Sequence, residues 1–105
     1  MRQYTTPTYT LTVKGVDLTA ADGVWVTFAD SNRAIIVTKD SPTVSASGDD
    51  TIVETTLSQA ETALFAEDTK SGVQVNWLDG TKRFATNIVQ ININENLLKE
   101  ILPNV

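Results

Sequence analysis

The chain has 105 residues and a net charge of −5, and it contains neither cysteine nor histidine. A chain of this length is expected to form a single domain, 1–105, with one modest core. The lack of cysteine excludes a disulfide framework, and the lack of histidine removes the commonest general acid–base group and a usual zinc ligand. We therefore expect no enzyme, no cofactor and no metal site.

The basic residues are scattered along the sequence instead of forming a cluster. Since phosphate binding needs a basic face, nucleic acid is not an expected partner. No apolar run approaches the ~20 residues that cross a bilayer, and residues 1–8 lack the apolar segment of a signal peptide. We expect no membrane partner and a protein made in the cytoplasm.

The first part of the chain has the alternating pattern of strands. Residues 9–14 alternate with odd-numbered apolar positions facing inward, and Leu18 is expected to close the end of the core. Residues 24–29 repeat the pattern with even-numbered apolar positions inward, which places Trp25 on the opposite face. Residues 34–38 are β-branched on both faces, which predicts a central strand.

The middle of the chain predicts two more strands and a short helix. Residues 43–45 suit a short edge strand, and residues 51–57 alternate again. Ser58 and Glu61 have the spacing of a capping box, in which the serine side chain bonds the third helical amide and the glutamate reaches back. We predict a helix over 59–65 that crosses one end of the sheets.

Residues 73–94 predict a hairpin whose second strand is irregular. Asp79-Gly80 between two alternating segments is among the strongest hairpin signals, and a two-residue loop there would pair Trp77 with Lys82.

The second strand of this hairpin changes the parity of its apolar face. Phe84 and Ile88 share one face, whereas the apolar residues from 89 to 93 share the other. A switch of one residue predicts a β-bulge or a bend near 87–89.

Near the C-terminus, four apolar residues recur at helical spacing: Leu97, Leu98, Ile101 and Leu102. We predict a short helix or a docking tail within 95–105, stopped by Pro103. Two alternatives stay open: the stripe folds onto its own sheets, or it is an apolar patch that needs a partner.

About seven short strands with one short crossing helix predict a mainly β fold, an antiparallel immunoglobulin-like β-sandwich. The Cys…Trp…Cys pattern of antibody domains is absent, so "immunoglobulin-like" describes the architecture alone.

Two acidic pairs are the candidate chemical groups, and simpler roles explain both. Asp49 and Asp50 beside a glycine lack the regular ligand offsets of a calcium loop and suit a solvated turn. Asp17 and Asp22 flank a connection, where Asx turns account for them.

Trp25 and the hairpin face of Trp77 and Arg83 are candidates for recognition. Either Trp25 covers the second side of its strand or packs under the helix that begins after Ser58, or it is exposed and anchors a partner, as aromatic residues often do at interfaces. A carbohydrate- or cell-surface-binding β-sandwich module is the alternative function on these residues.

Three stretches together carry a family resemblance. They are residues 9–13 followed by Asp17-Leu18-Thr19, residues 24–28 with their hairpin, and residues 57–65 leading to 73–79 and a closing segment at 91–98. This order resembles small proteins encoded among the tail genes of phages and prophages of Gram-positive bacteria. It is also similar to the N-terminal immunoglobulin-like domain of phage baseplate upper proteins.

The resemblance covers most of the chain and implies a structural module of a phage or prophage tail or baseplate. Its implied partners are other tail or baseplate proteins or a second copy of itself, and its implied location is the bacterial host cytoplasm and then the virion tail. It implies no catalytic residues. Baseplate upper proteins continue into coiled-coil and receptor-end parts, whereas this sequence stops at Val105, so the resemblance does not imply host binding.

Overall fold

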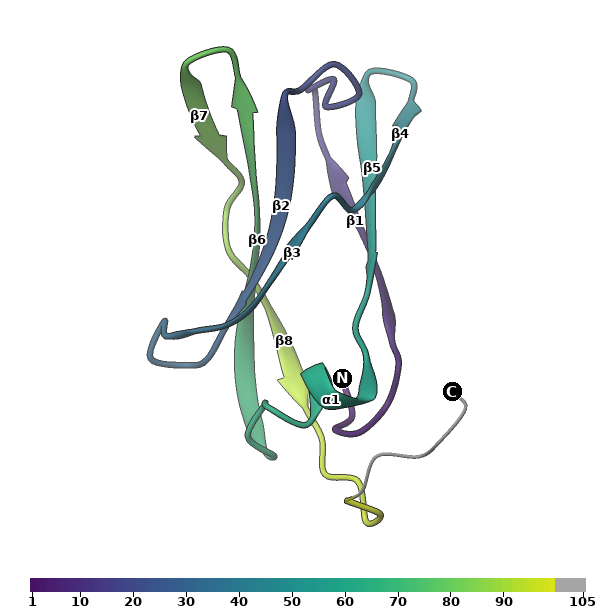
Figure 1. The fold of residues 1–105 in the computed structure, drawn as a ribbon, viewed down its shortest axis with the longest axis vertical. Coiled ribbons are helices and arrows are strands. Elements are labelled where there is room, and N and C mark those ends of the chain that lie inside the picture. Colours follow the sequence, from purple (N-terminus) through teal and green to yellow (C-terminus); the bar gives the residue numbers. More distant parts are fainter. Residues whose placement is uncertain (100–105) are drawn as a thin grey trace.

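The computed structural model describes residues 1–99. These residues form eight strands and one short helix (Figure 1). In chain order they are β1 (Thr8–Val13), β2 (Gly23–Ala29), β3 (Ile35–Asp40), β4 (Thr43–Ser47), β5 (Asp50–Thr56), α1 (Gln59–Thr62), β6 (Thr69–Asp79), β7 (Lys82–Ala85) and β8 (Val89–Ile93).

The strands form two antiparallel sheets. The smaller sheet has the order β1-β5-β4, and the larger has the order β3-β2-β6, after which β7 and β8 both pair with the free edge of β6. Figure 1 shows the β4–β5 hairpin at one end of the molecule and α1 at the other. In immunoglobulin nomenclature, the smaller sheet corresponds to strands B, E and D, and the larger to C′, C, F and G. The predicted immunoglobulin-like β-sandwich is confirmed.

The core lies between the two sheets and is centred on aromatic side chains. Phe28 is fully covered, and its ring centroid lies 5.7 Å from that of Tyr9 and 6.0 Å from that of Phe65. Leu18 closes one end of the core as expected, with 2% of its surface exposed. Each such large apolar side chain contributes about 1.5–3 kcal/mol when fully buried.

One strand lies in a different place from that predicted. The β-branched residues of 34–38 favoured a central position, but β3 is the edge strand of the larger sheet. Val37 is buried, whereas Ile35 is 68% exposed. The register of β2 with β3 shifts by one residue between the Phe28–Val37 and Ala29–Ile35 pairs, so Ile35 lies on the face opposite Val37 and is uncovered.

The hairpin between β6 and β7 turns one residue later than predicted. Asp79 pairs with Lys82, so Gly80 and Thr81 form the loop, and Trp77 faces Phe84 instead of Lys82. A positive φ of 63° at Gly80 is typical of a type II′ turn, in which glycine takes the first central position. The side chain of Asp22 accepts the Gly80 amide at 2.7 Å, which holds the turn at this position.

The predicted bulge is confirmed. Val73 pairs with Val89 and Asn76 with Ala85, so two residues of β6 face three residues of the partner segment. The extra residue divides the final ribbon into β7 and β8, which explains why eight strands are found instead of about seven. It also brings Phe84 onto the inner face with Val89, because it inverts the alternation between them.

The capping box at the start of α1 is confirmed, but the helix is shorter than predicted. Ser58 Oγ accepts the Glu61 amide at 3.1 Å, and Glu61 accepts the Ser58 amide at 2.8 Å. The helix ends at Thr62 and not at Phe65, and Leu64 beyond it is 64% exposed. No helix among residues 1–99 is long and apolar enough to cross a membrane.

The predicted C-terminal helix is not present in its described part. Residues 95–99 have no helical structure, and Ile101 and Leu102 lie outside the described residues. Asn96 gives the physical reason: its side-chain oxygen accepts the Leu98 amide at 3.2 Å, and its nitrogen donates to the Gln3 carbonyl at 3.1 Å. Such local side-chain bonds compete with the helical bonding pattern.

Candidate functional site

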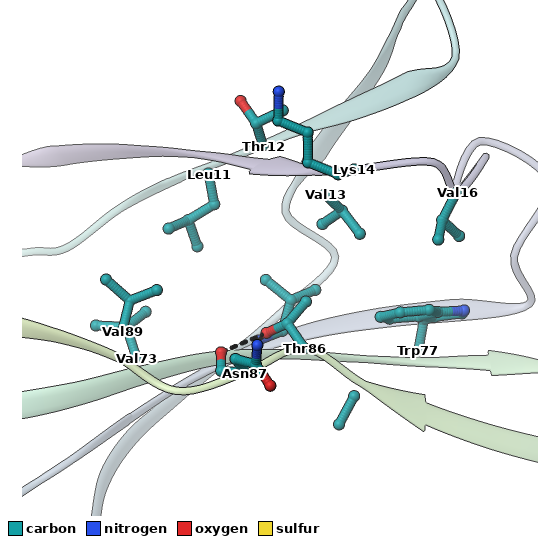
Figure 2. A pocket seen from close by; sticks show the side chains of 12 residues that line it. Leu11, Thr12, Val13, Lys14, Val16, Val73, Trp77, Thr86, Asn87 and Val89 are labelled. Carbon is teal, nitrogen blue, oxygen red and sulfur yellow. Dashed lines mark hydrogen bonds between the residues drawn. The ribbon is translucent and has the colours of Figure 1, made fainter.

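The two sheets leave an open space along one side, here called the interlayer cleft. It has a volume of about 440 Å³. Figure 2 shows Leu11, Val13 and Val16 on one side of it and Trp77, Thr86 and Val89 on the other. Its floor is buried, since Val73 is only 2% exposed, whereas Val89 at the rim is 52% exposed. The cleft therefore has an apolar floor and a rim that also carries polar groups, among them Thr86 and Asn87.

The bulge between β7 and β8 shapes one wall of this cleft. Thr86 exchanges two bonds with Val75: its amide donates to the Val75 carbonyl at 2.9 Å, and its hydroxyl accepts the Val75 amide at 3.1 Å. Gln74 Nε2 donates to the Thr86 carbonyl at 2.8 Å. These bonds satisfy backbone groups that the bulge would otherwise leave unpaired.

The other wall of the cleft is β1, which has one free backbone edge in the described part of the chain. β1 pairs only with β5, and the Leu57 amide donates to the Pro7 carbonyl, so the backbone groups of Pro7 face β5. In an antiparallel ladder these groups alternate in direction. The amides and carbonyls of Thr8, Thr10 and Thr12 therefore point away from β5, along the mouth of the cleft.

A second surface lies on the outer face of the larger sheet and is here called the outer groove. Two adjoining hollows of about 370 Å³ each make it, and they share Thr27, Ile35, Asn76 and Arg83. Trp25 lines one end, and Ile88 lines the other. The Trp25 ring lies against Gly23, because a Cβ built there would stand 2.6 Å from Trp25 Cη2. Trp25 is thus partly buried against its own sheet. It is neither fully covered nor fully exposed, which were the two alternatives predicted from the sequence.

The outer groove holds two cations without carboxylate partners. Neither Arg33 nor Arg83 forms a salt bridge within residues 1–99. Arg83 Nη2 makes one long bond of 3.4 Å to Asn76 Oδ1. Trp77 and Arg83 both line one of the two hollows, but the Trp77 ring stacks on Phe84 on the inner face, with centroids 5.6 Å apart.

The C-terminal residues form the third candidate surface. Leu97 is 93% exposed and Leu98 is 47% exposed, so Leu97 is uncovered and Leu98 is only half covered. The segment before them is held in place, since Arg2 donates to the Glu95 carbonyl and Lys99 Nζ lies 3.0 Å from Glu67 Oε2. The hydrogen bond that Lys99 donates to Glu67 raises the pKa of Lys99 above its usual value.

The acidic pairs considered from the sequence have separate structural roles. Asp17 accepts the amide and hydroxyl of Thr19, which holds the pKa of Asp17 below its usual value, and Asp22 holds the Gly80 turn. Asp50 accepts the Gly15 amide at 2.9 Å. Within residues 1–99, no group of three or more acidic, histidine or cysteine side chains is arranged to hold a metal ion.

Of the residues singled out from the sequence, Trp25 lies in the outer groove, and Leu97 and Leu98 belong to the segment after β8, which Figure 1 shows at the end of the molecule opposite the β4–β5 hairpin. The structure does not bring these two sets together. Sequence reasoning missed the interlayer cleft and the contribution of Arg33, although the parity switch in the last strand pointed to the bulge beside the cleft. Comparisons with protein-family models, with curated proteins and with solved structures find no match for this chain.

Proposed function

We propose that the protein is a non-enzymatic structural module that works by assembling with other protein chains, as in a phage or prophage tail or baseplate. The observation that carries this proposal is the exposure of Leu97 and Leu98 on a segment held in place by side-chain bonds. Apolar surface that is ordered but uncovered marks an interaction site. The kind of assembly, a phage or prophage tail or baseplate, is proposed from the sequence resemblance to tail-associated proteins.

The interlayer cleft supports the same proposal. It offers an apolar floor and a free strand edge, whereas its lining lacks the titratable groups of a catalytic site: among its residues only Lys14 is charged. A strand edge of this kind is a template for pairing with another chain. The expected partners are other tail or baseplate proteins or further copies of this chain.

Light scattering after size-exclusion chromatography tests the proposal. The unmodified chain is expected to show a mass above 11.4 kDa, and Leu97→Ser/Leu98→Ser is expected to lower it. The matched control is Ile35→Ser, which removes an exposed apolar side chain at the edge of the larger sheet. A strict monomer whose C-terminal residues are protected by their own core would refute the proposal.

A second candidate function is binding of a carbohydrate or cell-surface polymer at the outer groove. The observation that favours it is the presence of Trp25, Asn76 and Arg83 around one hollow, which combines an aromatic face with hydrogen-bonding groups. Small-ligand sites are concave and place a few polar groups on an apolar lining.

Tryptophan fluorescence distinguishes this candidate. The variant Trp77→Phe keeps the stacking on Phe84 and leaves Trp25 as the sole tryptophan, so its emission reports on the outer groove. A shift with neutral or acidic glycans that is lost in Arg83→Ala would support binding there. If the emission of Trp25 stays unchanged across a broad panel of glycans, the proposed glycan binding at the outer groove is refuted.

A further inference from the structure

The charged residues that line the outer groove are all cationic. Its two hollows are lined by apolar, hydroxyl and amide side chains together with Arg33 and Arg83, and no aspartate or glutamate is among these residues. The whole chain has the opposite balance, with 13 acidic and 8 basic residues. Because the groove carries two uncompensated positive charges on a negatively charged protein, it complements a ligand that carries negative charge.

The loop before β3 holds Arg33 over the larger sheet and leaves its charge free. Asp30 Oδ1 accepts the amides of Asn32 and Ala34, at 2.8 and 2.9 Å, so this neighbouring carboxylate serves the backbone of the loop. Arg33 has a positive φ of 68°, and its Nη1 atom stands 2.7 Å from the place where a Cβ on Gly72 would lie. The guanidinium of Arg33 therefore lies over the bare backbone of Gly72, without a salt bridge in the described part of the chain.

The cations of this face follow the direction of β6. Arg83 Nη2 reaches Asn76 on that strand, whereas Arg33 reaches Gly72. These two positions are four residues apart, which is about 13 Å along a strand. Lys70 lies two residues from Gly72 on the same face and extends the row, because alternate residues of a strand share a face. Hydrogen bonds of about 3 Å do not let one carboxylate bridge both arginines, so the row suits a chain with repeated anionic groups.

The other side chains of the groove favour a saccharide chain. The hydroxyls of Thr27 and Thr38 form no hydrogen bond within residues 1–99, and the side-chain nitrogen of Asn76 is also open to a ligand. Hydroxyl and amide groups donate and accept hydrogen bonds, as the hydroxyls of a sugar do. Trp25 adds an aromatic surface to the same hollow, against which the apolar side of a sugar ring packs.

We propose that the outer groove binds an acidic polysaccharide, whose carboxylates contact Arg33 and Arg83 and whose sugar rings pack against Trp25. The proposal rests on the second candidate function above and names the class of glycan. An arginine guanidinium stays charged at physiological pH and forms paired hydrogen bonds with a carboxylate. The two arginines thus select for negative charge, while the hydroxyl and amide groups hold the sugar.

The test compares two forms of one polymer. Polygalacturonate has a carboxylate on each sugar, and its methyl ester has the same backbone without the charges. In the Trp77→Phe variant, the emission of Trp25 is expected to shift with polygalacturonate, and the affinity for the ester should be lower by about tenfold or more. Since salt screens charged contacts, the affinity for polygalacturonate should also fall as the ionic strength rises from about 0.01 M to about 1 M.

Substitutions inside and outside the groove locate the contact. Arg33→Ala and Arg83→Ala are each expected to weaken binding of polygalacturonate by about tenfold or more, because a hydrogen bond to a charged group is lost. Arg33→Lys keeps the charge but not the paired donors, so its affinity should lie between those of Arg33→Ala and the unmodified residue. The matched control is Lys14→Ala, which removes the same charge from the interlayer cleft and should leave the affinity unchanged. Should Trp77→Phe fail to fold by circular dichroism, titration calorimetry of the unmodified chain measures the same affinities.

Three results would overturn the proposal in distinguishable ways. If the ester binds as tightly as polygalacturonate, or if both alanine variants keep the full affinity, glycan binding stands but the arginines do not select for charge. If polyglutamate binds as tightly as polygalacturonate and depends equally on Arg33 and Arg83, the groove takes acidic peptides and not acidic saccharides. If no glycan changes the emission or releases heat, the second candidate function fails together with this inference.

Discussion

The ammonium of Lys39 donates to both carboxylate oxygens of Glu61, at 2.9 and 3.0 Å. Lys39 lies on β3 at the edge of the larger sheet, and Glu61 lies on α1, which directly follows the smaller sheet. The pair therefore links the two layers at one end of the sandwich. Burial opposes ionisation of Glu61, but the Ser58 amide and Lys39 outweigh it and hold the pKa of Glu61 below its usual value of 4.5.

Glu61→Gln is expected to lower the free energy of unfolding at pH 7 by about 1 kcal/mol, because the cap is kept but the charged pair is lost. Since folding lowers the pKa of Glu61, its stabilising effect is complete above pH 4.5 and is lost as the pH falls through the folded-state pKa. Urea unfolding at pH 7 and pH 3 should show that the difference between the two proteins shrinks in acid. A difference that is equal at both pH values would contradict this assignment.

The bulge depends on the hydroxyl of Thr86, which accepts the Val75 amide. Thr86→Val keeps the shape of the side chain but leaves that amide without a partner, and we expect a loss of about 1–3 kcal/mol in chemical unfolding. Thr8→Val is the control, because its hydroxyl bonds Thr56 on the exposed surface. If both substitutions lower the free energy of unfolding by the same small amount, the bulge does not need this hydrogen bond.

Gly72 lies in the floor of the outer groove, where a Cβ would stand 2.7 Å from Arg33 Nη1 and 2.9 Å from Ile88 Cγ2. Gly72→Ala is therefore expected to cost about 1–3 kcal/mol through overpacking. In an Ile88→Ala background, the same substitution should cost less, since one of the two crowding atoms, Ile88 Cγ2, is gone. A thermal-unfolding double-mutant cycle measures the coupling, and strict additivity would argue against contact between the two sites.

Local patterns predicted most of this fold, because they depend on rules that act within a few residues. The alternation in 9–14 and 24–29 follows from the pleat of a strand, and the capping box at Ser58 follows from the unpaired amides of a helix start. The bulge could also be predicted, since an extra residue must invert the apolar alternation between Phe84 and Val89.

The wrong predictions concern contacts between distant residues. The loop at Gly80 is fixed by Asp22, which lies 58 positions earlier in the sequence. The edge position of β3 depends on which strands find partners, and that choice is invisible in the composition of 34–38. The predicted C-terminal helix failed in its described part because Asn96 bonds Gln3 at the other end of the chain.

The interlayer cleft could not be predicted from the sequence for a similar reason. Its walls come from β1 and from the segment between β7 and β8, which lie far apart in the chain and do not pair with each other. The alternation of Thr8, Thr10 and Thr12 shows which residues face outward, but it does not show that this edge has no partner strand within residues 1–99.

Amide hydrogen exchange in β1, followed by NMR at increasing protein concentration, tests the central claim most directly. The amides of Thr10 and Thr12 point away from β5, so they are expected to exchange quickly in dilute protein and to become protected as copies associate. The Leu11 amide, which faces β5, should be protected throughout. Protection of Thr10 and Thr12 that does not change with concentration, while the mass of the particle increases, would contradict the account.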